Sequence, residues 1–192
     1  MAKPFAEFFD ANEGVLRLAG QIGRVVGASL FVACCARVSL PLPFTPIPLT
    51  LANFGVLVVG LMLGARLGFL ALTLYLIEGA TGLPVFSPTG PGGFAQLIGP
   101  AGGFLLAYPL AAAVAGGIGG SGKPRLSRST AAALLADIVL FAGGISWLAI
   151  LTHSFSQAVD YGLYWFVFAE VSKVMLAAVV ARSGQGIGRI RK

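Results

Sequence analysis

Apolar residues occur along the whole chain in long runs, separated by short breaks that are polar or rich in Pro and Gly. A helix that crosses a bilayer needs about 20 mostly apolar residues. Runs close to this length recur from one end of the chain to the other, and they predict transmembrane helices over residues 18–40, 49–65, 67–82, 99–119, 130–152 and 161–182. The pattern therefore predicts an all-α, polytopic membrane domain of six spans over residues 18–182.

The remaining segments are short. Residues 1–17 combine charged side chains with aromatic ones, which is typical of a helix at the membrane interface, and residues 183–192 form a basic tail. The breaks at 39–48 and 83–99 are rich in Pro and Gly and contain no ionisable side chain. Uncharged irregular backbone of this length at a membrane surface is expected either as a lid over a cavity or as an ordinary turn-rich connection.

Composition supports a membrane protein and excludes a nucleic-acid-binding one. Of the 192 residues, 57% are hydrophobic and 10% are charged, and the mean hydropathy of +0.89 lies far above that of soluble domains. The net charge of +6 comes from dispersed residues and forms no basic stripe interleaved with aromatics.

The distribution of the basic residues predicts the orientation. If both termini lie inside the cell, the outer loops hold Arg37 alone. Because cytoplasmic loops carry an excess of Lys and Arg, we expect a multi-pass cell-membrane protein with both termini inside. The inner side then collects Lys3, Arg17, Arg24, Arg66, Lys123, Arg125, Arg128, Arg182, Arg189, Arg191 and Lys192.

An acid and a base in the last predicted span are the strongest candidates for a functional site. Glu170 and Lys173 lie three residues apart, hence on one helical face. At about 1.5 Å per residue from Tyr161 they fall near mid-membrane, where ionisable groups are costly unless they pair or face a polar cavity. We therefore favour a functional site, with a purely structural ion pair as the alternative. The aromatic residues just above are expected either in the wall of a site or in an interfacial belt; they are Tyr161, Tyr164, Trp165 and Phe166.

Other polar and small residues within the spans have two possible roles each. Asn53 can contact a ligand or bond between helices, and Glu78 can be a second contact or a solvated charge. Asp137 is expected to pair with a neighbouring helix. Gly23 and Gly27 form a small-residue face that either packs internally or contacts a partner, the second being favoured.

No sequence pattern supports catalysis, a cofactor or a metal site. The run from Gly117 to Lys123 resembles a phosphate-binding loop, but Pro124 occupies the position where Ser or Thr should bind magnesium, and no strand precedes it. HExxH, GxSxG and carboxylate–histidine clusters are all missing from the sequence. We therefore expect a protein that is not an enzyme and does not hydrolyse nucleotides.

Several segments together resemble the BioY family of biotin-binding subunits, over about residues 25–182. Their combination is more specific than any single one: Pro46-Ile-Pro-Leu-Thr-Leu-Ala-Asn53, Leu61-Met-Leu-Gly-Ala-Arg66-Leu-Gly, Gly79-Ala-Thr-Gly-Leu-Pro-Val-Phe86, Gly92-Gly93, Gly99-Pro-Ala-Gly-Gly103 and Glu170-Val-Ser-Lys173. The family usually has Asp at the position of Glu170 and Gln at that of Ala52.

The resemblance implies the S-component of an energy-coupling factor transporter, which captures vitamin from outside and depends on a transmembrane coupling subunit and paired ATPases. For biotin, Glu170 would accept from a ureido N–H, Lys173 would donate to the ureido carbonyl, and Asn53 can do either. Apolar walls are expected from Phe86, Phe94 and Tyr164, and an anion nest for the carboxylate from the backbone of Gly90 to Gly93. The alternatives are an S-component for another vitamin, or a membrane scaffold without a small-molecule site.

Overall fold

The computed structural model describes the backbone of residues 3–120 and 125–190, and the side chains of residues 14–120 and 125–183. The loop at 121–124 therefore lies outside the described residues, as do the side chains of most of the N-terminal segment and of the basic tail. The described elements are, in chain order, α1 (Lys3–Arg37), β1 (Ser39–Leu40), β2 (Leu49–Thr50), α2 (Ala52–Ala80), α3 (Gly93–Ile98), α4 (Gly102–Gly119), α5 (Leu126–Thr152), α6 (Phe155–Val159), the π-helix η1 (Asp160–Tyr164) and α7 (Val167–Ile190).

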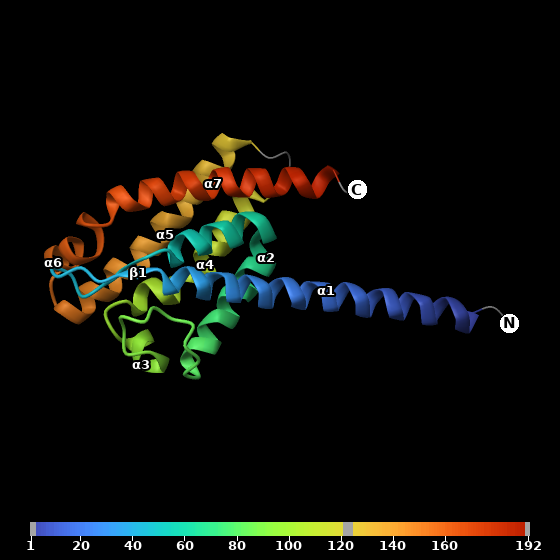
Figure 1. Cartoon of the computed structure of the whole chain (residues 1–192), viewed down its shortest axis with the longest axis horizontal. Coiled ribbons are helices and arrows are strands. Elements are labelled where there is room, and N and C mark those ends of the chain that lie inside the picture. Colours follow the sequence, from blue (N-terminus) through green and yellow to red (C-terminus); the bar gives the residue numbers. More distant parts are fainter. Residues whose placement is uncertain (1–2, 121–124, 191–192) are drawn as a thin grey trace.

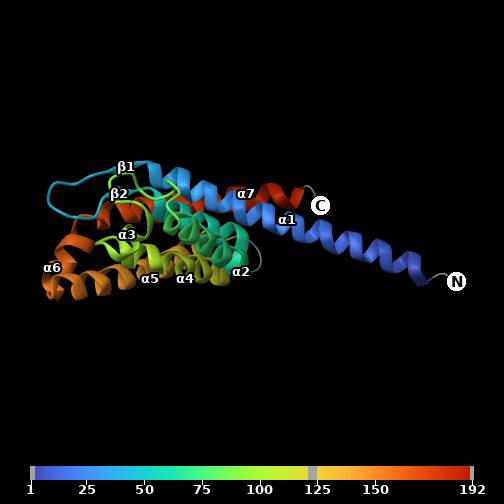
Figure 2. The same ribbon diagram turned by 90° about the horizontal axis from the view of Figure 1, so that it is seen from below.

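The helices form an elongated bundle in which α4 packs between α2 and α5, while α1 and α7 pack against α2 from outside. Both chain ends lie at one end of the bundle, and the N-terminal part of α1 projects beyond it (Figure 1). The two short strands, α3 and α6 gather at the opposite end, as Figure 2 also shows. The irregular segments of the chain are therefore concentrated at one end of the molecule.

The prediction of an apolar, helical membrane protein is confirmed. Gly14–Arg37, Ala52–Ala80, Gly102–Gly119 and Leu126–Thr152 are each long and apolar enough to cross a membrane. Phe155–Tyr164 and Val167–Ser183 together meet the same criterion as a pair bent by 49°. The described residues thus contain four or five candidate spans when α2 is counted as one.

Helix α2 reverses direction within its length. Gly64 has φ 81° and ψ 176°, which is not helical and is strained for any residue with a side chain. A Cβ on Gly68 would lie 3.3 Å from the Cα of Gly60, although eight residues along a straight helix span about 12 Å. The two arms of α2, residues 52–63 and 65–80, therefore fold back on each other, in agreement with the predicted break between 65 and 67.

The structure adds local detail to the predicted helical fold. The fold is mainly helical, as predicted, and it includes the two-residue strands β1 and β2, which pair Ser39 with Thr50 and Leu40 with Leu49. The intervening segment contains four prolines, which lack the N–H that a helix needs. Helix α1 is continuous from Lys3, with no break near residue 17, and the 83–99 loop contains the short helix α3.

The last predicted span is also interrupted. Residues 160–164 form the π-helix η1, and α7 begins only at Val167. Single turns of π-helix often occur at functional sites because they redirect the chain without ending the helix. Here the turn lies immediately before the part of α7 that carries Glu170 and Lys173.

Close backbone contact between α4 and the turn of α2 depends on Gly116. A Cβ on Gly116 would lie 2.3 Å from the carbonyl carbon of Gly64 and 2.4 Å from the nitrogen of Ala65. Both obstacles are backbone atoms, which cannot move aside as a flexible side chain can. Gly117, one residue later, has ordinary space, since a Cβ there would be 3.9 Å from the Cβ of Ala65.

We predict that Gly116→Ala lowers the free energy of unfolding by about 1–3 kcal/mol, because the added methyl overpacks the contact. Gly117→Ala is the matched control and should be neutral or slightly stabilising, since Ala is the better helix former. Thermal unfolding in detergent, followed by tryptophan fluorescence, measures both. Equal shifts for the two variants would contradict the close contact.

Candidate functional site

A cavity lies between α2, α4 and α7, beside the β1–β2 hairpin. About 550 Å³ between its walls, counted out to the open mouth, contains no protein atoms, and this is an upper bound on the room for a ligand. Its walls come from nearly every part of the fold: Ala36, Ile47, Pro48, Thr50, Ala52, Asn53, Tyr75, Ser87, Gln96, Ala101, Phe104, Leu105, Tyr108, Phe141, Phe166, Glu170 and Lys173. It is the kind of concave, mostly apolar site with a few convergent polar groups that binds small molecules.

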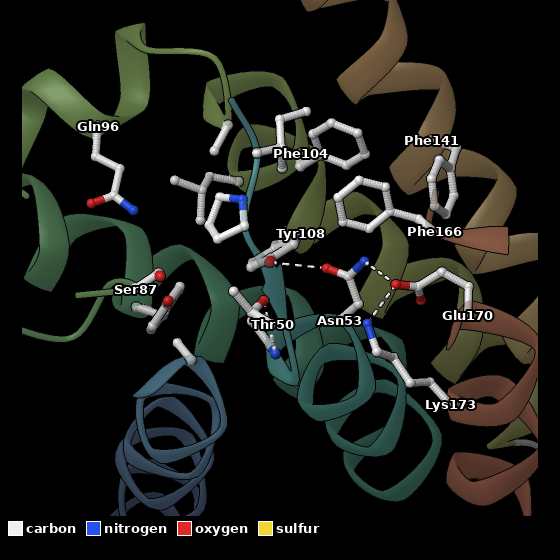
Figure 3. Close-up of a pocket in the computed structure, with 17 residues that line it drawn as sticks. Thr50, Asn53, Ser87, Gln96, Phe104, Tyr108, Phe141, Phe166, Glu170 and Lys173 are labelled. Atoms are coloured by element: carbon white, nitrogen blue, oxygen red, sulfur yellow. Dashed lines mark hydrogen bonds and ion pairs between the residues drawn. The ribbon is translucent and has the colours of Figure 1, made fainter. Parts of the chain in front are cut away.

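Four side chains form a buried polar network at one end of the cavity (Figure 3). Lys173 Nζ donates to Glu170 Oε1 over 2.6 Å, and Asn53 Nδ2 donates to the same oxygen over 3.1 Å. The hydroxyl of Tyr108 donates to Asn53 Oδ1 over 3.0 Å. The exposed fractions of Glu170 and Lys173 are only 2% and 7%. Asn53 thus uses both its donor and its acceptor to connect α7 with α4.

Local sequence explains how these groups meet. Glu170 and Lys173 are three residues apart in α7, so their side chains lie on one face and pair with each other. Asn53 is the second residue of α2, just after Thr50, whose hydroxyl accepts from the backbone N–H of Ala52 over 3.3 Å. This contact satisfies one of the free N–H groups at the start of α2. The network therefore joins the beginning of α2 to the early turns of α7.

A second polar group lies at the other end of the cavity. Gln96 of α3 is buried, and its Oε1 accepts from the backbone N–H of Gly92 over 3.1 Å. Ser87 is also buried and is hydrogen-bonded to Ser39 and Thr89, both over 2.8 Å. In Figure 3, Gln96 and Ser87 lie on the side of the cavity away from Glu170. The cavity is therefore polar at two ends.

Aromatic rings line the space between the two ends. Phe104 of α4 and Phe141 of α5 are in edge-to-face contact with ring centroids 5.7 Å apart. Phe166, just before α7, is buried and lines the same cavity. Tyr75 adds its ring from α2, and its hydroxyl donates to the carbonyl of Val85 over 3.2 Å. The middle of the cavity thus suits an apolar body with polar groups at both of its ends.

The structure brings together three of the predicted site residues, Asn53, Glu170 and Lys173, in the lining of the cavity. The other four predicted contact residues are not among those that line it. Phe86 is buried behind the wall, where its ring contacts Tyr75 and Gly79. Phe94 and Tyr164 are 63% and 67% exposed, and Gly93 lies at the start of α3.

The remaining candidates, Glu78, Asp137, Gly23 and Gly27, do not line the cavity. Ser29 Oγ donates to Glu78, so Glu78 bonds to α1 and does not line the cavity. Asp137 lines the cleft between α5 and α7, and no described residue forms an ion pair with it, so its expected pairing with a neighbouring helix stays a prediction. A Cβ on Gly23 or Gly27 would meet no described atom within 4 Å, so this face of α1 does not pack against the rest of the described chain.

Sequence reasoning missed Tyr108, Gln96, Phe104 and Phe141 as lining residues. Tyr108 and Phe104 lie within a uniformly apolar run, where nothing marks one face of the helix. Gln96 offered a usable signal, because it is the single amide side chain in the uncharged 83–99 segment, for which a lid over a cavity was one of the two expected roles. The described residues hold no cluster of three or more His, Cys, Asp or Glu that could hold a metal ion.

Comparison with known proteins identifies the class and then the family. The fold matches a crystal structure of the S-component for biotin from an ECF-type ABC transporter, with a TM-score of 0.79 at 22% identity, over 88% of this chain and 93% of that one. The fold is therefore that of a transporter S-component. Residues 10–189 match the BioY family, and the chain belongs to that family.

Named relatives agree with this assignment. A protein of Pyrococcus horikoshii named probable biotin transporter BioY is 37% identical over 159 residues, which cover 82% of this chain and 93% of the relative. The biotin transporter BioY of Thermotoga maritima is 32% identical over 161 residues, with the same two coverages. The resemblance seen in the sequence segments is thus confirmed.

We predict that Lys173→Met alone lowers the free energy of unfolding by about 3–5 kcal/mol, because it leaves the Glu170 carboxylate buried without its cation. The double variant Glu170→Leu/Lys173→Met removes both charges and should cost much less than the two single changes added together. Unfolding of the four proteins in detergent without ligand completes the cycle. Additive effects would mean that the two charges do not interact.

Proposed function

We propose that this protein is the S-component of an ECF-type biotin importer, which captures biotin at the outer face of the cell membrane. The observation that carries the proposal is the buried network of Glu170, Lys173, Asn53 and Tyr108 at one end of an aromatic-lined cavity. Membership of the BioY family and the names of its relatives support the same function. The protein is a transport protein and not an enzyme.

The two polar ends of the cavity fit the two ends of biotin. Glu170 can accept from a ureido N–H and Lys173 can donate to the ureido carbonyl, with Asn53 as a further partner. Phe104, Phe141 and Phe166 suit the apolar ring system, and they take the wall positions first expected of Phe86, Phe94 and Tyr164. The carboxylate then lies toward Ser87 and Gln96. The anion nest expected from the Gly90 to Gly93 backbone is not free as expected, because the N–H groups of Gly90 and Gly92 donate within the chain to Ser87 and Gln96.

In the proposed topology, six spans cross the membrane with both termini inside, and α2 contributes two of them. The reversal at Gly64 supports two crossings. So do the hydrogen bonds from Ser39 to Ser87 and Thr89, because they hold the 39–50 and 83–92 segments at the same end. These two segments form the proposed lid over the cavity mouth. Thr45 donates to the carbonyl of Tyr161 over 2.7 Å and so attaches the first segment to η1.

Energy for transport is proposed to come from other proteins. The chain has no complete phosphate-binding loop, so a transmembrane coupling subunit and paired ATPases would supply the work. The open face at Gly23 and Gly27 is the proposed contact for the coupling subunit, since small residues let helix backbones approach closely in lipid.

We predict that the purified protein in detergent binds labelled biotin, and that thiamine and riboflavin do not compete. Glu170→Gln and Lys173→Ala should each weaken binding by about 10- to 100-fold, because each removes a hydrogen bond to a charged group. Equilibrium binding measures this. Undiminished biotin affinity in both variants would refute the proposed site.

Neighbouring aromatics supply a matched control for the cavity wall. Phe166→Ala should weaken biotin binding, because Phe166 lines the cavity and is buried. Phe168→Ala removes an equal ring that is 89% exposed, and should leave binding unchanged. Competition by thiamine or riboflavin would instead identify an S-component for another vitamin. A folded protein that binds none of the three would favour a membrane scaffold.

We predict that a cysteine at Thr89 is labelled from outside intact cells, whereas one at Ser127 is labelled only after permeabilisation. Both positions are exposed, and the background carries Cys34→Ala and Cys35→Ala. A membrane-impermeant thiol reagent makes the measurement. If α2 crossed the membrane once, Thr89 would lie inside, so outer labelling at Thr89 tests the hairpin and the orientation together.

A further inference from the structure

One oxygen of Glu170 has no hydrogen-bond partner within the described structure, although it is buried. Glu170 Oε1 accepts from both Lys173 and Asn53, whereas Oε2 accepts from no described group. In Figure 3 both dashed lines reach one oxygen, and the other points away from them. A buried carboxylate oxygen without a donor is costly in an apolar medium.

Asp137 presents a second carboxyl group to the same place. Asp137 of α5 and Glu170 of α7 both line the cleft between these two helices. Asp137 Oδ1 is buried and, like Glu170 Oε2, lacks a partner among the described residues. Phe141, one helical turn from Asp137, and Glu170 each line both this cleft and the cavity, so the two spaces adjoin at these side chains.

The charges of Asp137, Glu170 and Lys173 do not balance if both carboxyl groups are ionised. Glu170 of α7 lines the same cleft as Asp137, and Lys173 of α7 is paired with Glu170. The other helices against α5 add no ion pair here: α4 has no charged residue, and its Tyr108 donates to Asn53. Asp160 is exposed in η1, and Glu78 of α2 bonds to Ser29. Two carboxylates would therefore share one ammonium group in the membrane interior.

We propose that Asp137 carries a proton and donates it as a hydrogen bond to Glu170 Oε2, and so acts as a positioning residue for the substrate site. A single proton between the two carboxyl groups gives an unpartnered oxygen its donor and makes the cluster with Lys173 electrically neutral. Glu170 then stays ionised with Oε1 turned toward Lys173, Asn53 and the cavity. The effect on biotin binding rests on the proposed function, whereas the proton on Asp137 does not.

Infrared spectroscopy of the ligand-free protein tests the proton directly. The wild type should show the carbonyl stretch of a buried carboxylic acid at neutral pH, and Asp137→Asn should lack it. Asp160→Asn is the matched control, because it removes an exposed acid and should leave the band in place. No such band in the wild type, or an unchanged band in Asp137→Asn, would overturn the proposal whether or not biotin binds.

Biotin affinity tests the positioning role. Asp137→Asn keeps an N–H donor and should stay within about threefold of the wild type, whereas Asp137→Ala loses the donor and should bind roughly tenfold more weakly. At alkaline pH the wild type should lose affinity as Asp137 ionises beside Glu170, and Asp137→Asn should lack this loss. Equal weakening in the Asn and Ala variants, or the same pH dependence in wild type and Asn variant, would contradict positioning. A wild type without biotin affinity would refute the proposed function and leave the infrared result standing.

Discussion

Burial of the Glu170–Lys173 pair in the membrane interior is the constraint on which the site depends. Ionisable groups in this position are tolerated when they pair and when their remaining hydrogen-bonding capacity is met. Asn53 and Tyr108 meet part of it, which ties α2 and α4 to α7. The same contacts leave the donors and acceptors of the pair at the edge of a cavity. The atoms that stabilise the buried pair by hydrogen bonds are therefore the same atoms that can bind a ligand.

Close packing of α4 against α2 and α5 holds the hydrogen-bonded side chains of this network in place. Gly60 and Gly116 allow the backbones of α2 and α4 to approach, and Gly103 and Gly143 do the same between α4 and α5. In lipid, where apolar association gains little from water, such backbone contact supplies much of the attraction between helices. The glycines of α4 therefore help to fix the position from which Tyr108 reaches Asn53.

Much of the fold and part of the site follow from the sequence, because lipid imposes long apolar runs and penalises charges within them. Glu170 and Lys173 were identifiable on that ground, and Asn53 as a polar residue near the start of a span. Phe94, Tyr164 and Phe166 were all named as possible wall residues, but only Phe166 of these lines the cavity, together with Phe104 and Phe141. When every face of a helix is apolar, the pattern does not distinguish the ring that faces a cavity from the ring that faces lipid.

The irregular elements explain why the cavity lies at one end of the bundle. The reversal at Gly64 brings the start of α2 beside its own second arm, and η1 bends the chain just before Glu170. The pairing of β1 with β2 and the hydroxyl contacts from Ser39 to Ser87 then hold two uncharged segments near the cavity. Backbone that is not helical needs partners in a membrane, and it finds them in protein around this cavity. The breaks in the helices thus collect at the site, where a small molecule can meet backbone and side-chain polar groups together.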